Sequence, residues 1–262
     1  MRRRLDAELV RRKIARSREQ AVEMIRSGRV VVGGFPAQKP ATVVEEGASI
    51  RVEGAEEDTW ASRGAHKLIG ALDAFGVDPT GQRVLDAGAS TGGFTDVVLR
   101  RGAREVVAVD VGYGQLIWRL QNDPRVRVHD RTNVRFLTPE QIGGPCDMMV
   151  GDLSFISLRL VLPALAQCVT GDLFPMVKPQ FEVGKERLGS GGVVRSAALR
   201  AEVTEQVAHE AQELGLGLRQ VVASPLPGPQ GNVEFFLWLT KGAPPARNVS
   251  ELVAQAVAEG PQ

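Results

Sequence analysis

The sequence predicts an α/β protein in which a small α+β module precedes a Rossmann-like, mostly parallel sheet of seven strands. Three observations support this fold class. Apolar residues make up 43% of the 262 residues, which is enough for a packed core. After residue 64, short apolar segments alternate with amphipathic segments, as they do in doubly wound sheets. Before residue 58, short helical segments come first and short strands follow.

The first module spans residues 1–58. Asp6 can cap a first short helix. Ser17 and Gln20 have the spacing of a capping box that opens a second helix, and Gly28 can end that helix. The expected strands of the module are 30–32 and 49–52.

Positive charge is concentrated in this module. Residues 1–29 hold ten Arg and Lys against four Asp and Glu, whereas the net charge of the whole chain is only +1. Such a surface attracts a polyanion such as RNA. Arginines that cluster beside the capping box suit a helix face that contacts the phosphates of RNA. Any pair of amphipathic helices can also carry exposed arginines. The candidate RNA-binding residues are Arg3, Arg4, Arg16 and Arg18.

A polar segment without hydrophobic periodicity, 53–58, ends the module. We therefore expect an interdomain linker at 59–63, a second domain at 64–245 and a frayed C-terminal tail at 246–262. The expected strands of the second domain are 83–87, 105–110, 126–129, 147–152, 173–178, 219–223 and 233–240, and the expected helices are 64–75, 92–101, 157–168 and 196–214. Only a Pro/Gly-rich loop joins the last two strands, so the final strand should run antiparallel.

A loop of small residues follows the first of these strands. It leads from a buried strand into a helix, so its glycines let the backbone approach a ligand closely. Neither the GxGxxG spacing of dinucleotide-binding loops nor the Gly-Lys-Ser/Thr of a P-loop is present. Acidic residues lie at or just after the ends of the next two strands, where they would meet a ribose and an adenine. The pattern therefore favours a loop that binds S-adenosylmethionine over an ordinary strand-to-helix turn. The candidate cofactor-binding residues are Asp86, Gly88, Ala89, Ser90, Gly92, Gly93, Phe94, Asp110 and Asp130.

Four ionisable residues are expected beside this cofactor: Lys67, Asp152, Lys178 and Glu234. Asp152 and Lys178 fall at the carboxyl ends of expected strands, where open α/β sheets bind their ligands. Glu234 begins the antiparallel strand at the same edge, and Lys67 sits among the inward positions of its helix. Singly, each is more typical of a solvated surface residue or a structural ion pair. Together they form a candidate catalytic site.

This group suits methyl transfer to a ribose 2′-hydroxyl, which requires an oxygen that is nearly deprotonated and aligned with the sulfonium methyl. A buried lysine beside another cation can have a lowered pKa and act as a base or stabilise the developing alkoxide. In this interpretation Lys178 is that group, and Asp152 and Glu234 set its orientation and charge. Lys67 helps to position the hydroxyl. No metal is required.

These motifs together resemble the TlyA (hemolysin A) family of ribosomal RNA 2′-O-methyltransferases, whose catalytic domain is FtsJ-like. Residues 4–32 resemble an S4 RNA-binding domain, and the likeness covers about residues 2–241. The family's Arg-x-Trp-Val linker is not matched, because this chain has Thr59-Trp60-Ala61, and this leaves the role of the linker open. The matching segments of the second domain are Ser62–Leu68, Asp86–Asp96, Gly151–Phe155, Val177–Glu182 and Glu234.

The resemblance implies a class I methyltransferase that depends on S-adenosylmethionine and carries a Lys-Asp-Lys-Glu tetrad at the four residues named above. It implies 2′-O-methylation of cytidine in 16S rRNA and, for some members, 23S rRNA, within assembled subunits. The expected partners are ribosomal RNA and ribosomal subunits, with no membrane and no metal. The favoured location is the cytoplasm, and the favoured oligomeric state is a monomer.

Two alternatives come from other classes of protein. The hemolysin name would suit a membrane-active protein, but no apolar segment approaches the ~18 residues that span a bilayer. A non-catalytic S4 RNA-binding factor would leave the tetrad and the cofactor loop without a use. Cys146 and Cys168 lie in apolar segments away from the histidines, so neither a zinc site nor a disulfide is indicated. The glycine-rich segment 189–192 suits a mobile lid and an ordinary flexible loop equally.

Overall fold

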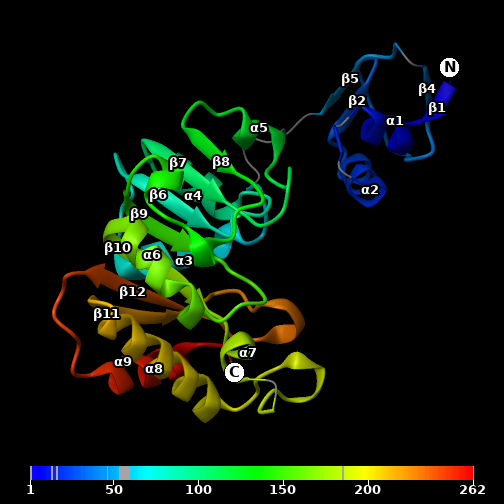
Figure 1. The fold of residues 1–262 in the computed structure, drawn as a ribbon. Helices are drawn as coiled ribbons and strands as arrows, with labels where there is room; N and C mark the ends of the chain where they lie inside the picture. Colours follow the sequence, from blue (N-terminus) through cyan, green and yellow to red (C-terminus); the bar gives the residue numbers. More distant parts are fainter. Residues whose placement is uncertain are drawn as a thin grey trace. The chain divides into compact units, whose positions relative to one another are not determined.

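The computed structural model describes residues 2–12, 14–15, 17–45, 47–52, 60–184 and 186–261. The chain divides into two compact units, Met1–Trp60 and Ala61–Gln262 (Figure 1). The polar segment expected at 53–58, and position 59 of the expected linker, lie outside the described residues.

The N-terminal unit packs helices against short antiparallel strands. Its described helices are α1 (Leu5–Arg11) and α2 (Arg18–Arg26), and its described strands are β1 (Arg2–Arg4), β2 (Val30–Val32), β3 (Phe35–Pro36), β4 (Val43–Glu45) and β5 (Ile50–Val52). Strand β1 pairs with β4, and β2 lies between β3 and β5. Both helices contribute to one apolar core, which includes Leu5, Leu9, Ala21, Ile25 and Val30.

Local hydrogen bonds set the helix boundaries of this unit. Ser17 is the N-cap of α2, and its Oγ accepts from the Gln20 N–H at 3.2 Å, which confirms the capping prediction. Gly28 follows the end of α2 with a φ of +74°, also as expected. The expectation that Asp6 caps α1 is wrong, because α1 begins at Leu5, directly after β1, and its N-cap is Arg4. The Asp6 carboxylate instead binds the guanidinium of Arg4.

The C-terminal unit is built on a sheet whose described strands number seven, in the order β11-β12-β10-β9-β6-β7-β8. The strands are β6 (Arg83–Ala87), β7 (Glu105–Val109), β8 (Val126–His129), β9 (Cys146–Gly151), β10 (Val169–Val177), β11 (Leu216–Ala223) and β12 (Phe235–Lys241). Neighbouring strands from β10 to β8 in this order run parallel. Strand β12 is antiparallel to both β10 and β11, which confirms the predicted reversal of the last strand.

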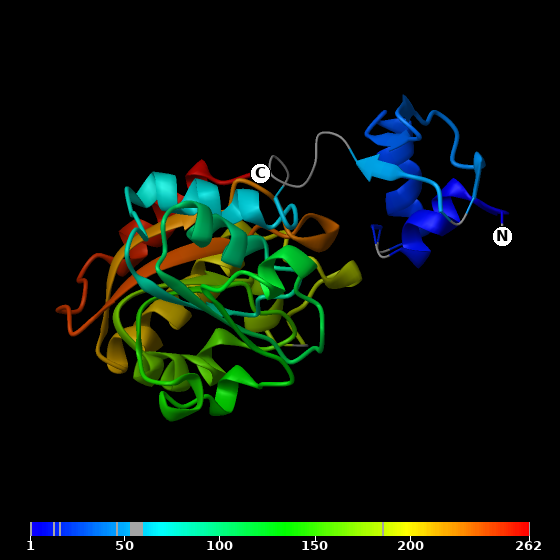
Figure 2. The same cartoon turned by 90° about the horizontal axis from the view of Figure 1, so that it is seen from above.

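Helices cover both faces of this sheet. The α-helices described are α3 (Ala65–Phe75), α4 (Gly93–Arg100), α5 (Trp118–Gln121), α6 (Leu162–Cys168), α7 (Pro179–Glu182), α8 (Ala197–Glu213) and α9 (Val249–Glu259), with 3-10 turns at Val134–Phe136, Glu140–Ile142, Leu158–Leu160, Ser190–Gly192 and Pro229–Gly231. Phe174 of β10 meets Phe75 of α3, with ring centroids 5.7 Å apart. Its neighbour Leu173 belongs to the core that α6 and α8 cover. Helices α3 and α4 therefore lie on one face, and α6 and α8 on the other (Figure 2).

The C-terminal residues form a helix, so the prediction of a frayed tail at 246–262 is wrong. Helix α9 packs against α8 and against β11. Its buried residues Val249, Val253 and Ala256 join the core of the sheet. They recur at the spacing of one helix face, and this face has an apolar surface to pack against. Tertiary contacts thus stabilise a short helix that local sequence features alone would leave marginal.

The packing of α9 predicts the effect of a single truncation. Val253→Ala removes two fully buried methyl groups and should lower the free energy of unfolding of the C-terminal unit by about 2 kcal/mol. Urea unfolding followed by tryptophan fluorescence measures the change. Gln255→Ala, on the exposed face of the same helix, is the matched control and should change stability by less than about 0.5 kcal/mol. An unfolding midpoint of Val253→Ala equal to that of the control would contradict this packing.

Candidate active site

The loop that follows β6 is held tightly against the loop that follows β9. Gly88 has a φ of +87°, which favours glycine, and a Cβ at this position would lie 2.8 Å from the carbonyl oxygen of Asp152. The N–H of Asp152 also donates to the carbonyl of Ala87 at 3.1 Å. A larger residue at position 88 would therefore push the expected cofactor loop away from Asp152.

Asp110 connects the cofactor loop to the end of β7. One of its carboxylate oxygens accepts from the Ser90 N–H at 2.8 Å, and the other accepts from the Gly112 N–H at 2.7 Å. A cavity of about 380 Å³, here called the Asp110 cavity, lies beside this contact. Its lining includes Asp110, Val111, Asn133, Val134, Leu153 and Ile156.

The residues of the Asp110 cavity fit an adenosine. Carboxylate oxygens have further lone pairs for the hydroxyls of a ribose, beyond the two backbone N–H groups that Asp110 already accepts. The side chains of Val111, Val134, Leu153 and Ile156 supply apolar walls for an adenine. The chemistry of this lining therefore suits S-adenosylmethionine.

The other cofactor candidates fall into three groups. Ala89, Gly93 and Phe94 line a second, larger cavity. Gly92 packs instead against α5, because a Cβ there would lie 2.3 Å from a methyl carbon of Leu120. Asp130 lies outside the linings of both cavities, and its carboxylate accepts from the N–H of Gly114 at 2.8 Å. The structure thus brings Asp110, but not Asp130, to the lining of the Asp110 cavity.

Asp86 supports the cofactor loop from inside the protein. It is fully buried at the end of β6, and the hydroxyl of Thr95 on α4 donates to its carboxylate at 2.6 Å. Burial raises the pKa of the Asp86 carboxyl to about 7. The Thr95 hydrogen bond opposes this shift of the pKa, and the negative charges of Asp152 and Asp110 add to it. Asp86 therefore holds its proton well above the usual pH range of an aspartic acid.

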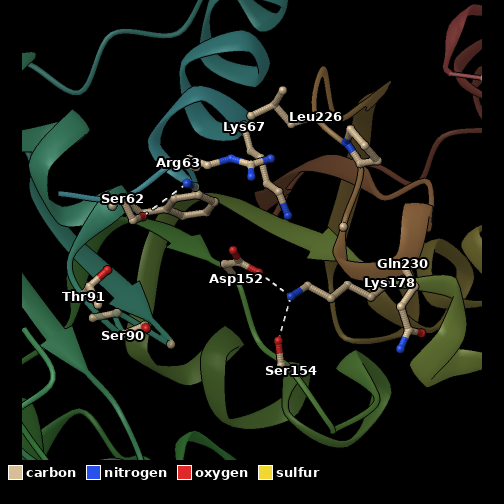
Figure 3. Close-up of a pocket in the computed structure, with 17 residues that line it drawn as sticks. Ser62, Arg63, Lys67, Ser90, Thr91, Asp152, Ser154, Lys178, Leu226 and Gln230 are labelled. Atoms are coloured by element: carbon tan, nitrogen blue, oxygen red, sulfur yellow. Dashed lines mark hydrogen bonds and ion pairs between the residues drawn. The ribbon is translucent and has the colours of Figure 1, made fainter. Parts of the chain in front are cut away.

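The larger cavity, of about 640 Å³, brings three of the four catalytic candidates together and is here called the Lys178 cavity. Lys67 comes from α3, Asp152 follows β9 and Lys178 follows β10. Figure 3 shows the Lys67 side chain extending from α3 toward the Asp152–Lys178 pair. The carboxyl edge of the sheet thus gathers these residues, as the order of the strands predicts.

The tetrad is arranged as two ion pairs. The Nζ of Lys178 lies 2.5 Å from an oxygen of Asp152 and donates to the Oγ of Ser154 at 2.8 Å. The Nζ of Lys67 donates to Glu234 at 2.5 Å. The expectation that Glu234 orients Lys178 is therefore wrong. Glu234 immediately precedes β12, the strand next to β10, but its carboxylate pairs with Lys67 of α3, which lies over the same edge of the sheet.

Glu234 is shielded from solvent by the loop that precedes β12. Its side chain is completely buried, whereas 11% of the Lys67 side chain is exposed. A Cβ at Gly228 would lie 2.2 Å from the Glu234 carboxylate, so a larger residue there would displace the carboxylate or the loop that covers it. Burial strengthens the attraction between the two charges because little water screens them.

A third cavity adjoins the tetrad on the side of α7. It has a volume of about 570 Å³ and is here called the Phe155 cavity. Phe155 is 91% exposed and has a φ of +63°, a conformation that is rare for bulky residues and is often found at functional sites. Its ring lies 5.3 Å from that of Phe181. In the sequence, Ser154 and Phe155 belong to the matching segment Gly151–Phe155, but neither was assigned a role, since exposure and backbone strain become visible only in the fold.

The glycine-rich segment 189–192 forms part of the wall of the Phe155 cavity. Gly192 lines this cavity, as does Asn232. The Asn232 side chain donates to the carbonyl of Gly192 at 2.9 Å and accepts from the N–H of Val194 at 3.0 Å. The segment is thus fixed to the residues that precede β12.

The arginines expected to bind RNA lie in the N-terminal unit. Arg4 donates to Asp6 at 3.1 Å and 2.8 Å, and about half of its side chain is exposed. Arg3 lies 3.9 Å from the carboxylate of Glu8. Both side chains are therefore tethered by acidic neighbours and still reach the surface.

Arg18 occupies a different part of the same unit. It borders a hollow on the surface of α2 together with Val22 and Arg26. Arg16 lies outside the described residues. The structure therefore places three of the four arginine candidates.

The raised pKa of Asp86 predicts how stability changes with pH. Between the ordinary aspartate pKa and about 7 the folded protein binds a proton that the unfolded chain has lost, so stability falls as pH rises through this window. Asp86→Asn removes this dependence, because its side chain stays neutral. As the pH rises from 5 to 8, we therefore expect the melting temperature of the wild type to fall by a few degrees relative to that of Asp86→Asn.

Differential scanning calorimetry at several pH values, without cofactor, tests this expectation. Asp73→Asn, at an exposed position on α3, is the control and should follow the wild-type pH profile. Parallel profiles for the wild type and Asp86→Asn would rule out the titration of Asp86.

Comparisons with known proteins agree with this geometry. The model of the FtsJ-like methyltransferase family matches residues 60–241, and that of the S4 domain matches residues 3–50. The 16S/23S rRNA (cytidine-2′-O)-methyltransferase TlyA of Mycobacterium tuberculosis is 58% identical over 98% of both chains. The 23S rRNA (cytidine-2′-O)-methyltransferase TlyA of Campylobacter jejuni is 32% identical over 70% of this chain and 72% of its own. A candidate hemolysin of known structure from Streptococcus thermophilus is 37% identical, with a TM-score of 0.72 over 98% of this chain and 96% of its own. The chain therefore belongs to the TlyA family of ribosomal RNA methyltransferases, with an S4 domain followed by an FtsJ-like domain.

Proposed function

We propose that this protein transfers a methyl group from S-adenosylmethionine to the 2′-hydroxyl of cytidine in ribosomal RNA. The proposed substrates are 16S rRNA and 23S rRNA, the two rRNAs in the name of the M. tuberculosis relative. We propose that the enzyme modifies them within assembled subunits. The observation that carries the proposal is the position of the Lys178–Asp152 pair. The Asp110 cavity and the Lys178 cavity share Gly88, Ser90, Asp152 and Ser154, so they meet beside this pair.

The residues proposed to hold the cofactor are Asp110 at the ribose and the apolar walls of the Asp110 cavity at the adenine. The backbone from Gly88 to Ser90 approaches the remainder of the cofactor. S-adenosylmethionine supplies a methyl group on a positively charged sulfur, which is a good leaving group. The protein then has to present the acceptor oxygen in line with this methyl group and take up its proton.

Lys178 is proposed to contact the acceptor oxygen directly. An ammonium group has three N–H donors, and among the described residues Asp152 and Ser154 engage two of them. The third can point at the ribose 2′-oxygen, where it stabilises the negative charge that develops as the new carbon–oxygen bond forms. Lys178 passes one of its protons to the Asp152 carboxylate and takes up the hydroxyl proton in its place, and Asp152 then releases its proton to water.

Lys67 is proposed to position the acceptor from the other side of the cavity. Its ion pair with the buried Glu234 fixes the lysine in one orientation, so less side-chain entropy is lost when the RNA binds. A second cation at the acceptor also favours a negative charge on the oxygen. The proposed division of roles is a direct contact through Lys178 and positioning through Lys67.

The base of the target nucleotide is proposed to enter the Phe155 cavity. This cavity shares Ser154, Lys178 and Gln230 with the Lys178 cavity, so a ribose at Lys178 lies next to it. Exposed aromatic rings are typical stacking surfaces for bases that leave a helix. Phe155 and Phe181 provide such a surface.

The N-terminal unit is proposed to bind the rRNA backbone through its arginines, and the enzyme is proposed to act as a cytoplasmic monomer without a metal. In the described ranges, no helix has the length and apolar character needed to cross a membrane. The membrane-active alternative would be supported by leakage from liposomes at physiological salt, which the proposed function does not produce.

Mapping of the modified nucleotide tests the proposed function. Small and large subunits from cells that lack the gene are incubated separately with the protein and S-adenosylmethionine. Primer extension at low nucleotide concentration should then stop at a new position, and nuclease digestion should yield 2′-O-methylcytidine. Subunits that gain no 2′-O-methylcytidine would show that the proposal is wrong.

The role of Lys178 predicts a loss of turnover. Lys178→Ala should lower kcat by about 10²- to 10⁴-fold, the range typical of a missing proton-transfer group. Transfer of tritiated methyl groups to ribosomal subunits measures kcat, and calorimetry with S-adenosylhomocysteine should show nearly unchanged affinity. Arg219→Ala, which removes an exposed cation on β11, is the control and should retain full turnover. Full transfer by Lys178→Ala would exclude the proposed mechanism.

The role of the arginine-rich unit predicts a change in RNA affinity without a change in chemistry. Arg18→Ala should raise the KM for ribosomal subunits and leave kcat unchanged. It should also reduce the slope of log affinity against log salt concentration by about 1, the value for one lost phosphate contact. Arg51→Ala, at an exposed position on β5, is the control. An unchanged salt slope for Arg18→Ala would show that this arginine contacts no phosphate.

A further inference from the structure

Gln180 is one of the polar residues that line the Phe155 cavity, among apolar neighbours. Its Oε1 is buried, and no donor among the described residues hydrogen-bonds to it. Buried side-chain oxygens without a partner are uncommon in folded proteins because burial removes water without replacing it. A ligand that carries a donor would satisfy this oxygen.

The position of Gln180 is fixed relative to the tetrad. It is the second residue of α7, which begins directly after Lys178. The Glu182 carboxylate, at the end of the same helix, accepts from the Ser157 hydroxyl at 2.5 Å and from the Leu158 N–H at 2.7 Å. Helix α7 is therefore tied to the loop that carries Phe155.

The rest of the lining suits a flat ring. Phe155, Ile156, Phe181 and Leu188 supply apolar surface around Gln180. An aromatic base can stack on such a surface while its edge hydrogen-bonds to a side-chain amide. Because Lys178 lines both this cavity and the neighbouring one, a single nucleotide can place its ribose at Lys178 and its base beside Gln180.

We infer that Gln180 hydrogen-bonds to the Watson–Crick edge of the target base and makes the enzyme select cytidine. This inference rests on the proposed function. Cytosine presents an N4–H donor next to the N3 acceptor, and these two groups are complementary to the oxygen and the nitrogen of the amide. With Oε1 at the buried end, uracil would set its O4 against this oxygen, and both acceptors would be left without a donor. A match to uracil requires the amide to turn over and to bury its NH₂ group instead.

The test compares two ribosomal substrates. Once the target cytidine is mapped, subunits are prepared from cells that express plasmid-borne rRNA with this cytidine or with uridine in its place. The 2′-hydroxyl is the same in both, so a difference in kcat/KM reports recognition of the base. The wild type should prefer cytidine by about 10- to 100-fold, the range for one bidentate contact.

Gln180→Leu should abolish the preference by lowering kcat/KM for the cytidine substrate and leaving that for uridine unchanged. Gln180→Met, with an unbranched apolar side chain of similar length, is the second variant and should behave in the same way. Melting temperature and affinity for S-adenosylhomocysteine should stay at wild-type values in both variants. Gln206→Leu, at an exposed position on α8, is the matched control.

The outcomes separate this inference from the proposed function. Equal use of cytidine and uridine by the wild type, or an unchanged preference in Gln180→Leu, would overturn the inference and leave the proposed function intact. A wild type that methylates neither substrate would overturn the proposed function and the inference with it.

Discussion

The close approach between Gly88 and the carbonyl of Asp152 determines how the rest of the site is built. It joins the loop after β6 to the loop after β9 without an intervening side chain. The first of these loops borders the adenosine-sized cavity, and the second carries Asp152, Ser154 and Phe155. Since all three cavities meet at Ser154, the cofactor, ribose and base subsites proposed above share one short segment of backbone.

Charge balance imposes the second constraint on this site. Each lysine of the tetrad is paired with its own carboxylate, so the cavity can hold two cations with little net charge. Removing one partner of such a pair is more damaging than replacing both, because the remaining charge stays buried and uncompensated. This asymmetry favours the retention of all four residues as a unit, even where only one of them contacts the acceptor.

Much of the fold could be predicted because each strand of the sheet is a short apolar segment between turn residues. The meeting of Asp152 and Lys178 followed from the parallel strands, which bring their carboxyl ends to one edge, and Lys67 was expected there from its place among the inward positions of its helix. The partner of Glu234 could not be predicted, because the choice between Lys67 and Lys178 depends on how α3 packs over that edge. Helix α9 was missed because its stability comes from contacts with α8 and β11, and the strained φ of Phe155 has no signature in sequence.

Helix α9 also has a consequence for association between copies of the protein. Strand β11 stands at one end of the sheet order, so one side of it has no neighbouring strand within the described sheet. Exposed strand edges of this kind pair readily with other chains and lead to aggregation. Helix α9 packs its apolar residues against β11 and α8 at this end of the sheet, so loss of the helix would uncover apolar side chains beside the unpaired edge. The last helix therefore lowers the tendency of this end of the sheet to associate with other chains, independently of any part in catalysis.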